Sequence, residues 1–539
     1  MVSRRRVLLS FRLACLVVWG LSMVGTPAAQ ENSAPAADTA ATDPMFDVWE
    51  FQIRGNSKID SIDIERAVYP HLGPAKTIKD VEKARAALES VYREKGFATV
   101  LVDIPEQDVI DGVVYLAVTE GEIERLRVSG SRYFALGRIK SKVPALAKGE
   151  VPYIPEVQRQ LAEVNRLSPD RTIIPVLRPG KTPGKLEVEL KVDDQLPLHG
   201  EIEINDRFTR DTERLRLNAS IRYDNLWQRE HSATFAYQVA PQNPDNVEVF
   251  SGTYVFKIPN SMWTMAFYGV GTNSDVATVG TLGVVGSGRI FGVRATRSIE
   301  AQGSLFQGIT LGLDYKDFDE SIDLIGADTL NTPISYHKFS AEYSATHLGD
   351  SGTSRFGVGI HWALRGLTNN EGEFEDKRFK ARPNFMYLTA SAERLQRLPH
   401  GIELFARLKG QVTKDPLISN EQLGFGGFDS VRAYLESQVF VDDGVDLKLE
   451  LRSPSLANAV WGELDQLQLL AFVDAAKGRI QDSLPGQDNS FFIWSTGLGM
   501  KIRAFDGLNA TLYWAYPLKD NGTIDAGNSR VHFTTGYQF

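Results

Sequence analysis

The chain has 539 residues, of which 42% are hydrophobic and 24% are charged, and its net charge is −9. This acidic balance argues against nucleic acid as a partner, because contacts to phosphate groups require an excess of Lys and Arg. A single cysteine, Cys15, excludes an internal disulfide.

The first 29 residues have the pattern of a secretory signal peptide. A basic start (MVSRRR) precedes an apolar stretch at 7–24 and a small-residue site, TPAAQ, at 26–30. Cys15 permits a lipoprotein alternative, but Arg12 stands where such signals have Leu. Cleavage after Ala29 removes four arginines and no acidic residue, so the net charge changes from −9 to −13. Residues 30–44 are Ala-rich and polar, which predicts a flexible leader.

Residues 45–194 predict two copies of a small β-α-α-β-β unit, called here the first α/β module (45–120) and the second α/β module (121–194). The first has strand patterns at 46–53, 99–104 and 113–118 and helical patterns at 61–72 and 78–95. The second has strand patterns at 123–128, 172–177 and 186–192 and helical patterns at 135–146 and 156–167. Each module therefore needs a sheet covered by helices.

Residues 195–539 alternate with a period of two. In 445–452 (VDLKLELR) every second residue is charged, and 402–409 behaves similarly. Such segments fit strands with one face toward lipid and one toward water. No run of 18 apolar residues follows residue 29, so we expect no membrane-spanning helix. Sixteen such segments predict a closed antiparallel barrel; they begin near residues 199, 213, 231, 247, 262, 287, 303, 335, 354, 383, 401, 444, 467, 490, 507 and 529.

The connections between these segments alternate between short and long, which is typical of periplasmic turns and outer loops. Residues 453–466 are an exception, because this connection should be short. In the last segment Phe533, Tyr537 and Phe539 share one face. We expect this strand to close the barrel, with its terminal aromatic ring at the membrane interface.

Five short sequences carry a resemblance to a known family. The modules resemble POTRA domains, with YREKGF at 92–97 similar to their helix-to-strand junction. The sequences LSPD at 167–170 and PVLRPG at 175–180 resemble the end of the second POTRA domain of two-partner secretion transporters, the haemolysin secretion/activation family. The loop residues Val431, Arg432, Ala433 and Tyr434 resemble that family's Val-Arg-Gly-Tyr motif, and Phe472 and Asp474 resemble its Phe-x-Asp-x-Gly strand motif.

The resemblance covers essentially the whole mature chain and implies that a loop at about 413–440 folds back into the barrel lumen. The alternation at 469–474 turns Asp474 inward, where Arg432 on an infolded loop can reach it; the alternative is that the two are unrelated, solvated charges. In a wet lumen such a pair is worth at most ~1 kcal/mol. Ala433 and Ala476 replace the two motif glycines, which puts the loop geometry in question. Residues 30–44 are too short and helix-poor to supply the plug helix that family members often carry.

The resemblance further implies an outer-membrane translocator in a Gram-negative bacterium, with its modules in the periplasm. Its partner would be a secreted exoprotein, whose extended or unfolded N-terminal secretion domain adds a strand to a sheet edge. Outer-membrane lipids would surround the barrel, and the barrel-assembly machinery would insert it. The alternative is a BamA-like insertase, which typically carries more POTRA units; a diffusion porin would need no periplasmic module. The cargo stays open between an adhesin, a haemolysin and a haem binder.

Patterns of catalytic sites are missing from the sequence. Eight histidines are scattered without a His-x-x-x-His cluster, so we predict no metal site. No Gly-x-Ser-x-Gly occurs, and GFGG at 424–427 lacks the Lys of a phosphate-binding loop. We therefore expect neither enzymatic activity nor a cofactor.

Overall fold

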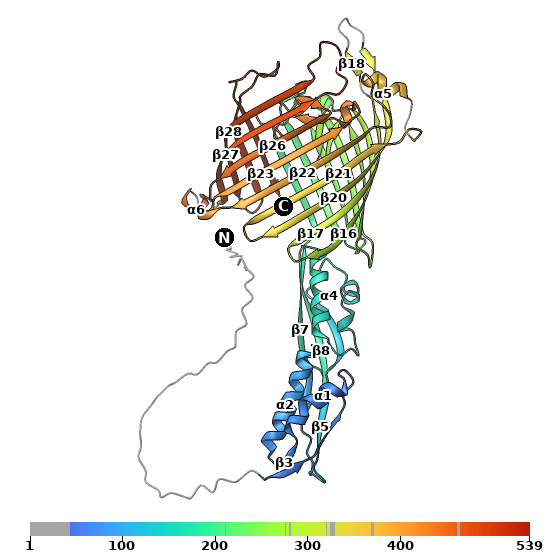
Figure 1. Cartoon of the computed structure of the whole chain (residues 1–539), viewed down its shortest axis with the longest axis vertical. Coiled ribbons are helices and arrows are strands. Elements are labelled where there is room, and N and C mark those ends of the chain that lie inside the picture. Colours follow the sequence, from blue (N-terminus) through green and yellow to red (C-terminus); the bar gives the residue numbers. More distant parts are fainter. Residues whose placement is uncertain are drawn as a thin grey trace. The chain divides into compact units, whose positions relative to one another are not determined.

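A computed structural model describes residues 44–539 except 211, 275, 280–281, 320, 324–328, 368–370 and 461–463. The expected signal peptide and all but the last residue of the leader lie outside the described residues. The chain divides into two compact units, one of Met1–Tyr92 with Leu101–Thr119 and one of Arg93–Val100 with Glu120–Phe539. Figure 1 shows the elements of both units along the chain.

The first module contains a three-stranded sheet of β2 (Glu50–Arg54), β5 (Val113–Glu120) and β4 (Val100–Asp103), with β2 parallel to β5. Helices α1 (Ser61–Val68) and α2 (Ile78–Glu94) belong to the same module. The apolar face of α2 consists of Val81, Ala84, Leu88 and Tyr92, each at most 1% exposed. The elements thus follow the order that the sequence predicts.

Two details of the first module differ from the sequence prediction. The expected helix 61–72 ends at Val68 and continues as the 3-10 turn η1 (Tyr69–His71), because Pro70 lacks the N–H that would extend it. The expected strand 46–53 is split into β1 (Phe46–Val48) and β2, and β1 pairs with an unexpected strand, β3 (Gly73–Lys76). A small second sheet results.

The second module repeats this plan with β6 (Glu122–Ser129), α3 (Leu136–Ser141), η2 (Pro144–Leu146), α4 (Ile154–Arg166), β7 (Arg171–Pro179) and β8 (Lys185–Asp194). Its sheet has the order β6-β8-β7, with β6 parallel and β7 antiparallel to β8. Ile139, Leu146 and Leu190 are fully buried in its core. The expected helix 135–146 is interrupted before Pro144, whose ring cannot continue an α-helix.

Sixteen antiparallel strands form a closed barrel, as predicted. In order around the wall they are β9 (Leu198–Asn205), β10 (Arg216–Leu226), β11 (His231–Val239), β12 (Glu248–Lys257), β13 (Trp263–Thr272), β16 (Gly288–Gln302), β17 (Leu305–Phe318), β20 (Ile334–Gly349), β21 (Gly352–Ala363), β22 (Met386–Arg397), β23 (Glu403–Thr413), β26 (Asp443–Arg452), β27 (Leu464–Arg479), β28 (Ser490–Ala504), β29 (Leu508–Pro517) and β30 (Arg530–Gln538). β30 pairs with β9. Each wall strand lies close to its predicted segment.

The wall connections carry small elements of their own. Long connections hold the hairpins β14 (Val276–Val279) with β15 (Leu282–Val285), β18 (Ser321–Asp323) with β19 (Thr329–Asn331), and β24 (Leu423–Phe425) with β25 (Val439–Val441). They also hold η3 (Pro244–Asn246), α5 (Glu371–Lys377) and η5 (Ser419–Glu421), while η4 (Pro399–Gly401) and α6 (Ala457–Val460) lie at the other end of the wall. The helix α6 lies in the connection after β26, which the sequence marks as unexpectedly long.

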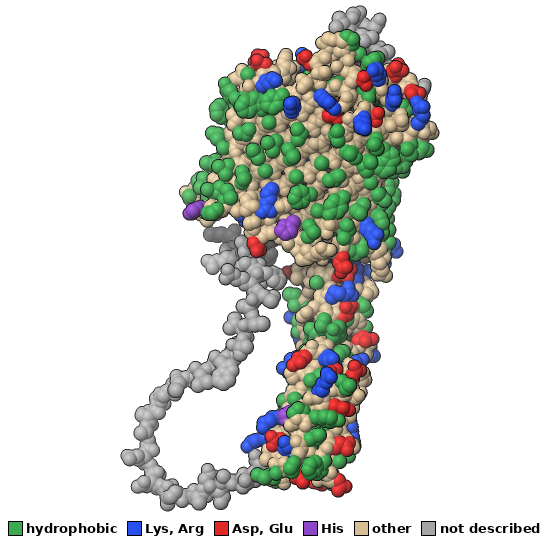
Figure 2. Space-filling view, in the orientation of Figure 1, with side chains coloured by type: hydrophobic (Ala, Val, Ile, Leu, Met, Phe, Trp, Pro, Cys, Tyr) green, Lys and Arg blue, Asp and Glu red, His purple; other side chains and the backbone are tan. Residues whose placement is uncertain are grey.

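The outside of the wall is apolar. Along β27, Leu469 and Val473 are 47% and 43% exposed, whereas Leu470, Phe472 and Asp474, at the alternate positions, are buried. Figure 2 shows hydrophobic side chains spread over the barrel exterior. None of the helices in the described part of the chain is long and apolar enough to cross a membrane. The exposed positions of the strand are apolar, as expected for the lipid-facing side of a membrane barrel.

The last strand completes the wall. Thr534–Gln538 pair with Glu201–Asn205 of β9, and Phe539 exchanges two backbone hydrogen bonds with Gly200, at 3.0 and 3.1 Å. The Phe539 ring occupies the space where Gly200 would carry a Cβ atom. Tyr537 and Phe539 are 48% and 63% exposed, while Phe533 is half-buried.

Candidate functional site

The connection between β23 and β26, residues 414–442, is largely buried although it is a loop; we call it the lumenal loop. Its β24–β25 hairpin carries Phe425, Val431, Tyr434 and Val441, which pack against Ala476 of β27 and Ile493 of β28. Its Phe428 and Ala433 pack with Phe472 and Tyr513, two other inward-facing wall residues. The loop therefore lies against the inner faces of β27, β28 and β29.

Arg432 at the loop tip lies beside Asp474 of β27. Its Nε and Nη2 each donate to one carboxylate oxygen of Asp474, both at 2.6 Å, and its backbone N–H also donates to Oδ2 at 3.2 Å. The guanidinium carbon lies 3.5 Å from the centre of the Phe472 ring. Both charged side chains are 0% exposed. The motif residues are thus brought together in a two-pronged ion pair capped by an aromatic ring.

The value of at most ~1 kcal/mol holds for a pair in a wet lumen, and neither side chain of this pair is exposed to water. Since neither side chain of the pair contacts solvent, removing one partner leaves a buried charge, which costs about 3–5 kcal/mol rather than the ~1 kcal/mol of an exposed pair.

Glu450 of β26 is a third member of this ion-pair cluster, although it belongs to neither family motif. Its Oε1 accepts from Arg432 Nη1 at 2.7 Å, and its Oε2 lies 2.6 Å from Arg452 Nη2 and 3.3 Å from Lys501 Nζ. The alternating charges of VDLKLELR indicate that Glu450 faces inward, but nothing in the sequence pairs it with a loop residue. Arg432 is therefore held by two carboxylates from neighbouring strands.

The other motif residues fix the loop backbone. Ala433 has a φ of 79°, in the left-handed region that favours glycine, and its N–H donates to His532 Nε2 of β30 at 3.2 Å. Tyr434 Oη lies 2.6 Å from the Lys519 carbonyl oxygen and 3.2 Å from that of Trp494. Ala433 therefore keeps the backbone conformation that the family's glycine would adopt without strain.

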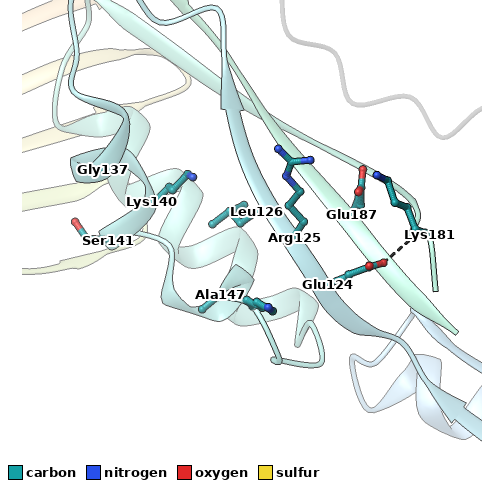
Figure 3. Close-up of a pocket in the computed structure, with 10 residues that line it drawn as sticks. Glu124, Arg125, Leu126, Gly137, Lys140, Ser141, Ala147, Lys181 and Glu187 are labelled. Carbon is teal, nitrogen blue, oxygen red and sulfur yellow. Dashed lines mark hydrogen bonds between the residues drawn. The ribbon is translucent and has the colours of Figure 1, made fainter. Parts of the chain in front are cut away.

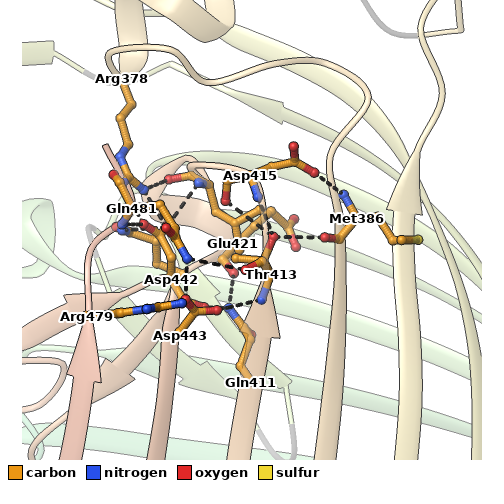
Figure 4. A network of polar contacts seen from close by, with 12 residues as sticks. Arg378, Met386, Gln411, Thr413, Asp415, Glu421, Asp442, Asp443, Arg479 and Gln481 are labelled. Carbon is orange, nitrogen blue, oxygen red and sulfur yellow. Dashed lines mark hydrogen bonds and ion pairs between the residues drawn. The ribbon is translucent and has the colours of Figure 1, made fainter. Parts of the chain in front are cut away.

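At the end of the lumenal loop, a second group of buried carboxylates fixes the backbone. Arg378, which follows α5, donates two hydrogen bonds to Asp442, at 2.5 and 2.6 Å. Asp442 also accepts from the backbone N–H groups of Leu417 and Gln481, at 3.0 and 2.7 Å. Figure 4 shows Arg378, Asp442 and Gln481 close to Asp443, whose carboxylate accepts from Thr413 N.

A second set of contacts fixes the start of the lumenal loop to another part of the wall. Glu421 of η5 is buried between Lys316 of β17 and Lys338 of β20, at 2.5 and 3.1 Å. Tyr336 and Tyr387 also donate to this carboxylate, at 2.6 and 2.7 Å. Sequence reasoning misses these partners because they are widely separated along the chain.

A groove in the second module lies between the edge strand β6 and α3. Its cavity is about 810 Å³, and Figure 3 shows residues of β6 on one side and Gly137, Lys140 and Ser141 on the other. The lining includes four basic residues, Arg125, Lys140, Lys148 and Lys181, and two acidic ones, Glu124 and Glu187. Backbone hydrogen bonds from Thr182 and Lys181 lower the pKa of Glu124.

The outer edge of β6 is occupied only at its start. Ile123 exchanges hydrogen bonds with Glu150 and Gly149, at 2.9 and 2.8 Å. Beyond Ile123, no strand among the described residues pairs with this edge, since β6 forms a ladder with β8 alone. The groove therefore borders free backbone groups of a strand.

Comparisons with known proteins cover nearly the whole chain. The family model "Haemolysin secretion/activation protein ShlB/FhaC/HecB" matches residues 184–502, and the model "POTRA domain, ShlB-type" matches residues 46–121. The outer membrane transporter CdiB of Dickeya dadantii (strain 3937) is 20% identical over 516 residues, which are 93% of this chain and 88% of the relative.

Two solved structures share the fold. CdiB from Escherichia coli superposes with a TM-score of 0.59 at 17% identity, covering 94% of this chain and 93% of that one. BamA from Haemophilus ducreyi, lacking POTRA domains 1–3, gives a TM-score of 0.55 at 12% identity, covering 92% and 100%.

Replacing Arg432 or Asp474 by Ala should release the loop tip and raise the time-averaged conductance of the barrel in planar bilayers. A loss of about 3 kcal/mol weakens docking by roughly two powers of ten. Because both residues serve one contact, the double variant should be no worse than either single one. Arg365→Ala, which removes an exposed pair with Glu371, is the control. If the two single effects simply add, the residues act independently.

Replacing Ala433 and Ala476, the two alanines at the motif glycine positions, by glycine should have opposite effects on docking of the lumenal loop. Ala433→Gly relieves a left-handed strain of about 1–2 kcal/mol, more than the ~0.4–1 kcal/mol of added unfolded-state entropy, so it should favour the docked loop. Ala476→Gly removes a buried methyl group that packs beside Phe425, so it should disfavour docking. Opening frequency in single-channel recordings is the measurement. If both substitutions change the opening frequency in the same direction, backbone strain at Ala433 does not control docking of the loop.

Proposed function

The chain belongs to the haemolysin secretion/activation family ShlB/FhaC/HecB, and we propose that its α/β modules capture an extended segment of the exported protein while the lumenal loop closes the barrel. As a member of this family it is an outer-membrane transporter of two-partner secretion, with its POTRA domains in the periplasm and a secreted exoprotein as its partner. The capture mode and the role of the loop are our proposals.

The observation that carries the capture step is the free edge of β6 beside the groove. An extended segment of the exoprotein's N-terminal secretion domain adds as a strand to this edge, and main-chain hydrogen bonds supply the affinity. Arg125, Lys140 and Lys148 line the groove, so it favours segments with acidic side chains beside the added strand. Both the backbone of the cargo and its acidic side chains then contribute to capture.

The lumenal loop is the proposed barrier to transit. Arg432, Glu450 and Asp474 hold its tip, and an arriving chain displaces it only by offering contacts that replace theirs. Once the tip leaves, the barrel interior between β26 and β30 becomes accessible. Folding of the exported protein outside the cell makes the passage irreversible, so binding and folding energy drive transport. The proposed mechanism therefore requires no catalytic step.

Lipids surround the apolar wall, and we propose that the barrel-assembly machinery inserts it. The alternative function, a BamA-like insertase, rests on a shared fold at 12% identity. Two-partner transport is favoured because both the family model and the CdiB relatives are transporters of this class. The cargo is a large secreted protein of the adhesin, haemolysin or haem-binding kind.

Deleting residues 45–120 should leave an inserted barrel and abolish secretion of the partner. The reason is that the deleted module lies outside the wall strands, whose pairing it does not enter. Surface exposure of the outer loops and the amount of partner in the medium are the two measurements. Undiminished secretion would show that this module is dispensable for capture.

Reversing two charges in the groove tests the capture step more sharply. Lys140→Glu with Lys148→Glu should lower secretion at least about tenfold, an effect of ~1.4 kcal/mol on binding. Arg138→Glu with Arg166→Glu makes the same change in net charge on exposed positions of the same module outside the groove. Equal secretion by the two double variants would reject this groove as the capture site.

A further inference from the structure

Three metal-ligating side chains meet where the second module joins the barrel. They are Asp170, which follows α4, His199 of β9 and Asp224 of β10. His199 Nε2 lies 3.2 Å from Asp170 Oδ2 and 3.4 Å from Asp224 Oδ2, and the three ligand atoms all lie within 4.8 Å of one another. The side chain of Asp170 is 0% exposed, and those of Asp224 and His199 are 16% and 28% exposed. The cluster is therefore largely removed from water.

One ring nitrogen cannot satisfy both carboxylates. His199 Nε2 carries at most one proton in either tautomer and in the charged ring, yet two carboxylate oxygens face it. Two carboxylates held this close repel each other unless a positive charge lies between them. A cation bound by all three atoms would give both carboxylate oxygens a shared positive partner and would remove the repulsion between them.

The far oxygens of both carboxylates are already oriented by other groups. Asp170 Oδ1 accepts from Gln195 Nε2 at 3.0 Å, and Asp224 Oδ1 accepts from Ser232 Oγ at 2.5 Å. Such outer hydrogen bonds hold ligating carboxylates in place in metal sites. Arg222 Nε also donates to Asp224 Oδ2 at 2.9 Å from a side chain that is 48% exposed, so a metal ion would have to displace this partly exposed contact. The inner oxygens are thus presented toward His199.

We propose that Asp170, His199 and Asp224 bind a divalent transition-metal ion, of which zinc is the best fit. Zinc takes imidazole nitrogen and carboxylate oxygen at about 2.0–2.1 Å, which puts tetrahedral ligand atoms roughly 3.3 Å apart, close to both distances from His199. Water supplies the fourth ligand. Calcium is disfavoured because it takes oxygen ligands only.

The site would clip the second module to the barrel. Asp170 belongs to the segment that leads into β7, whereas His199 and Asp224 belong to the first two wall strands, and only residues 195–197 separate β8 from β9. A metal ion bridging these segments restrains that short connection. The spacing of 29 residues between Asp170 and His199 hides such a site from a search for local histidine motifs.

The test is zinc binding by the full-length transporter, purified in detergent without a histidine tag and stripped with a chelator. Metal analysis after dialysis against zinc should find about one ion per chain. Asp224→Asn and His199→Ala should each weaken zinc binding at least about tenfold in calorimetric titrations. Asp224→Asn keeps a group that accepts from Ser232, so it tests the site if His199→Ala fails to fold.

The control is His71→Ala, which removes a histidine from η1 and should leave zinc binding unchanged. Zinc, but not calcium, should also slow proteolytic cleavage at residues 195–197 in the unaltered protein and not in Asp224→Asn. Heat-modifiable migration in gels verifies that each barrel is folded. The proposal is overturned if the unaltered protein binds no zinc, or if His71→Ala loses zinc as fully as the two site variants do.

Discussion

Every backbone N–H and C=O group of a strand in hydrocarbon must find a partner within the protein, because lipid offers none. The wall meets this requirement only by closing, and β30 pairs with β9 to do so. Closure also fixes which side chains face inward, since the side chains of a strand alternate. The lumen is therefore lined by every second side chain of each strand, and in this chain many of these side chains are charged.

These inward charges explain why a loop is buried at all. Asp474, Glu450, Lys316 and Lys338 lie on wall strands, and each pairs with a residue of the loop. Charges removed from water are tolerated only when they are paired and hydrogen-bonded. Wall and loop thus depend on each other: the loop neutralises charges of the wall, and the wall satisfies those of the loop. Apolar packing around Phe425 and Phe428 then fills the remaining space.

The sequence predicts the wall well and the interior poorly. Alternation is a local property, so each strand and its inward face follow from the residues themselves, as with Phe472 and Asp474. Pairs such as Glu421 with Lys316 or Arg378 with Asp442 join residues far apart in sequence, and no local period encodes them. Likewise β3 forms only because β1 offers it an edge. The family motifs include Arg432 but not Glu450, because a motif is a run of residues along the sequence and does not contain their neighbours in space.

Because the ion pair of the lumenal loop is buried and the charges of the groove are exposed, the two respond differently to ionic strength. Mobile ions weaken interactions between exposed charges at distances beyond about 10 Å in 0.1 M salt, and they affect buried pairs much less. Arg432 and Asp474 are fully buried, whereas Lys140 and Lys148 are exposed. A change in salinity therefore acts on the charges of the groove and leaves the buried contact between Arg432 and Asp474 largely as it is, so these two parts of the protein respond differently to the same environment.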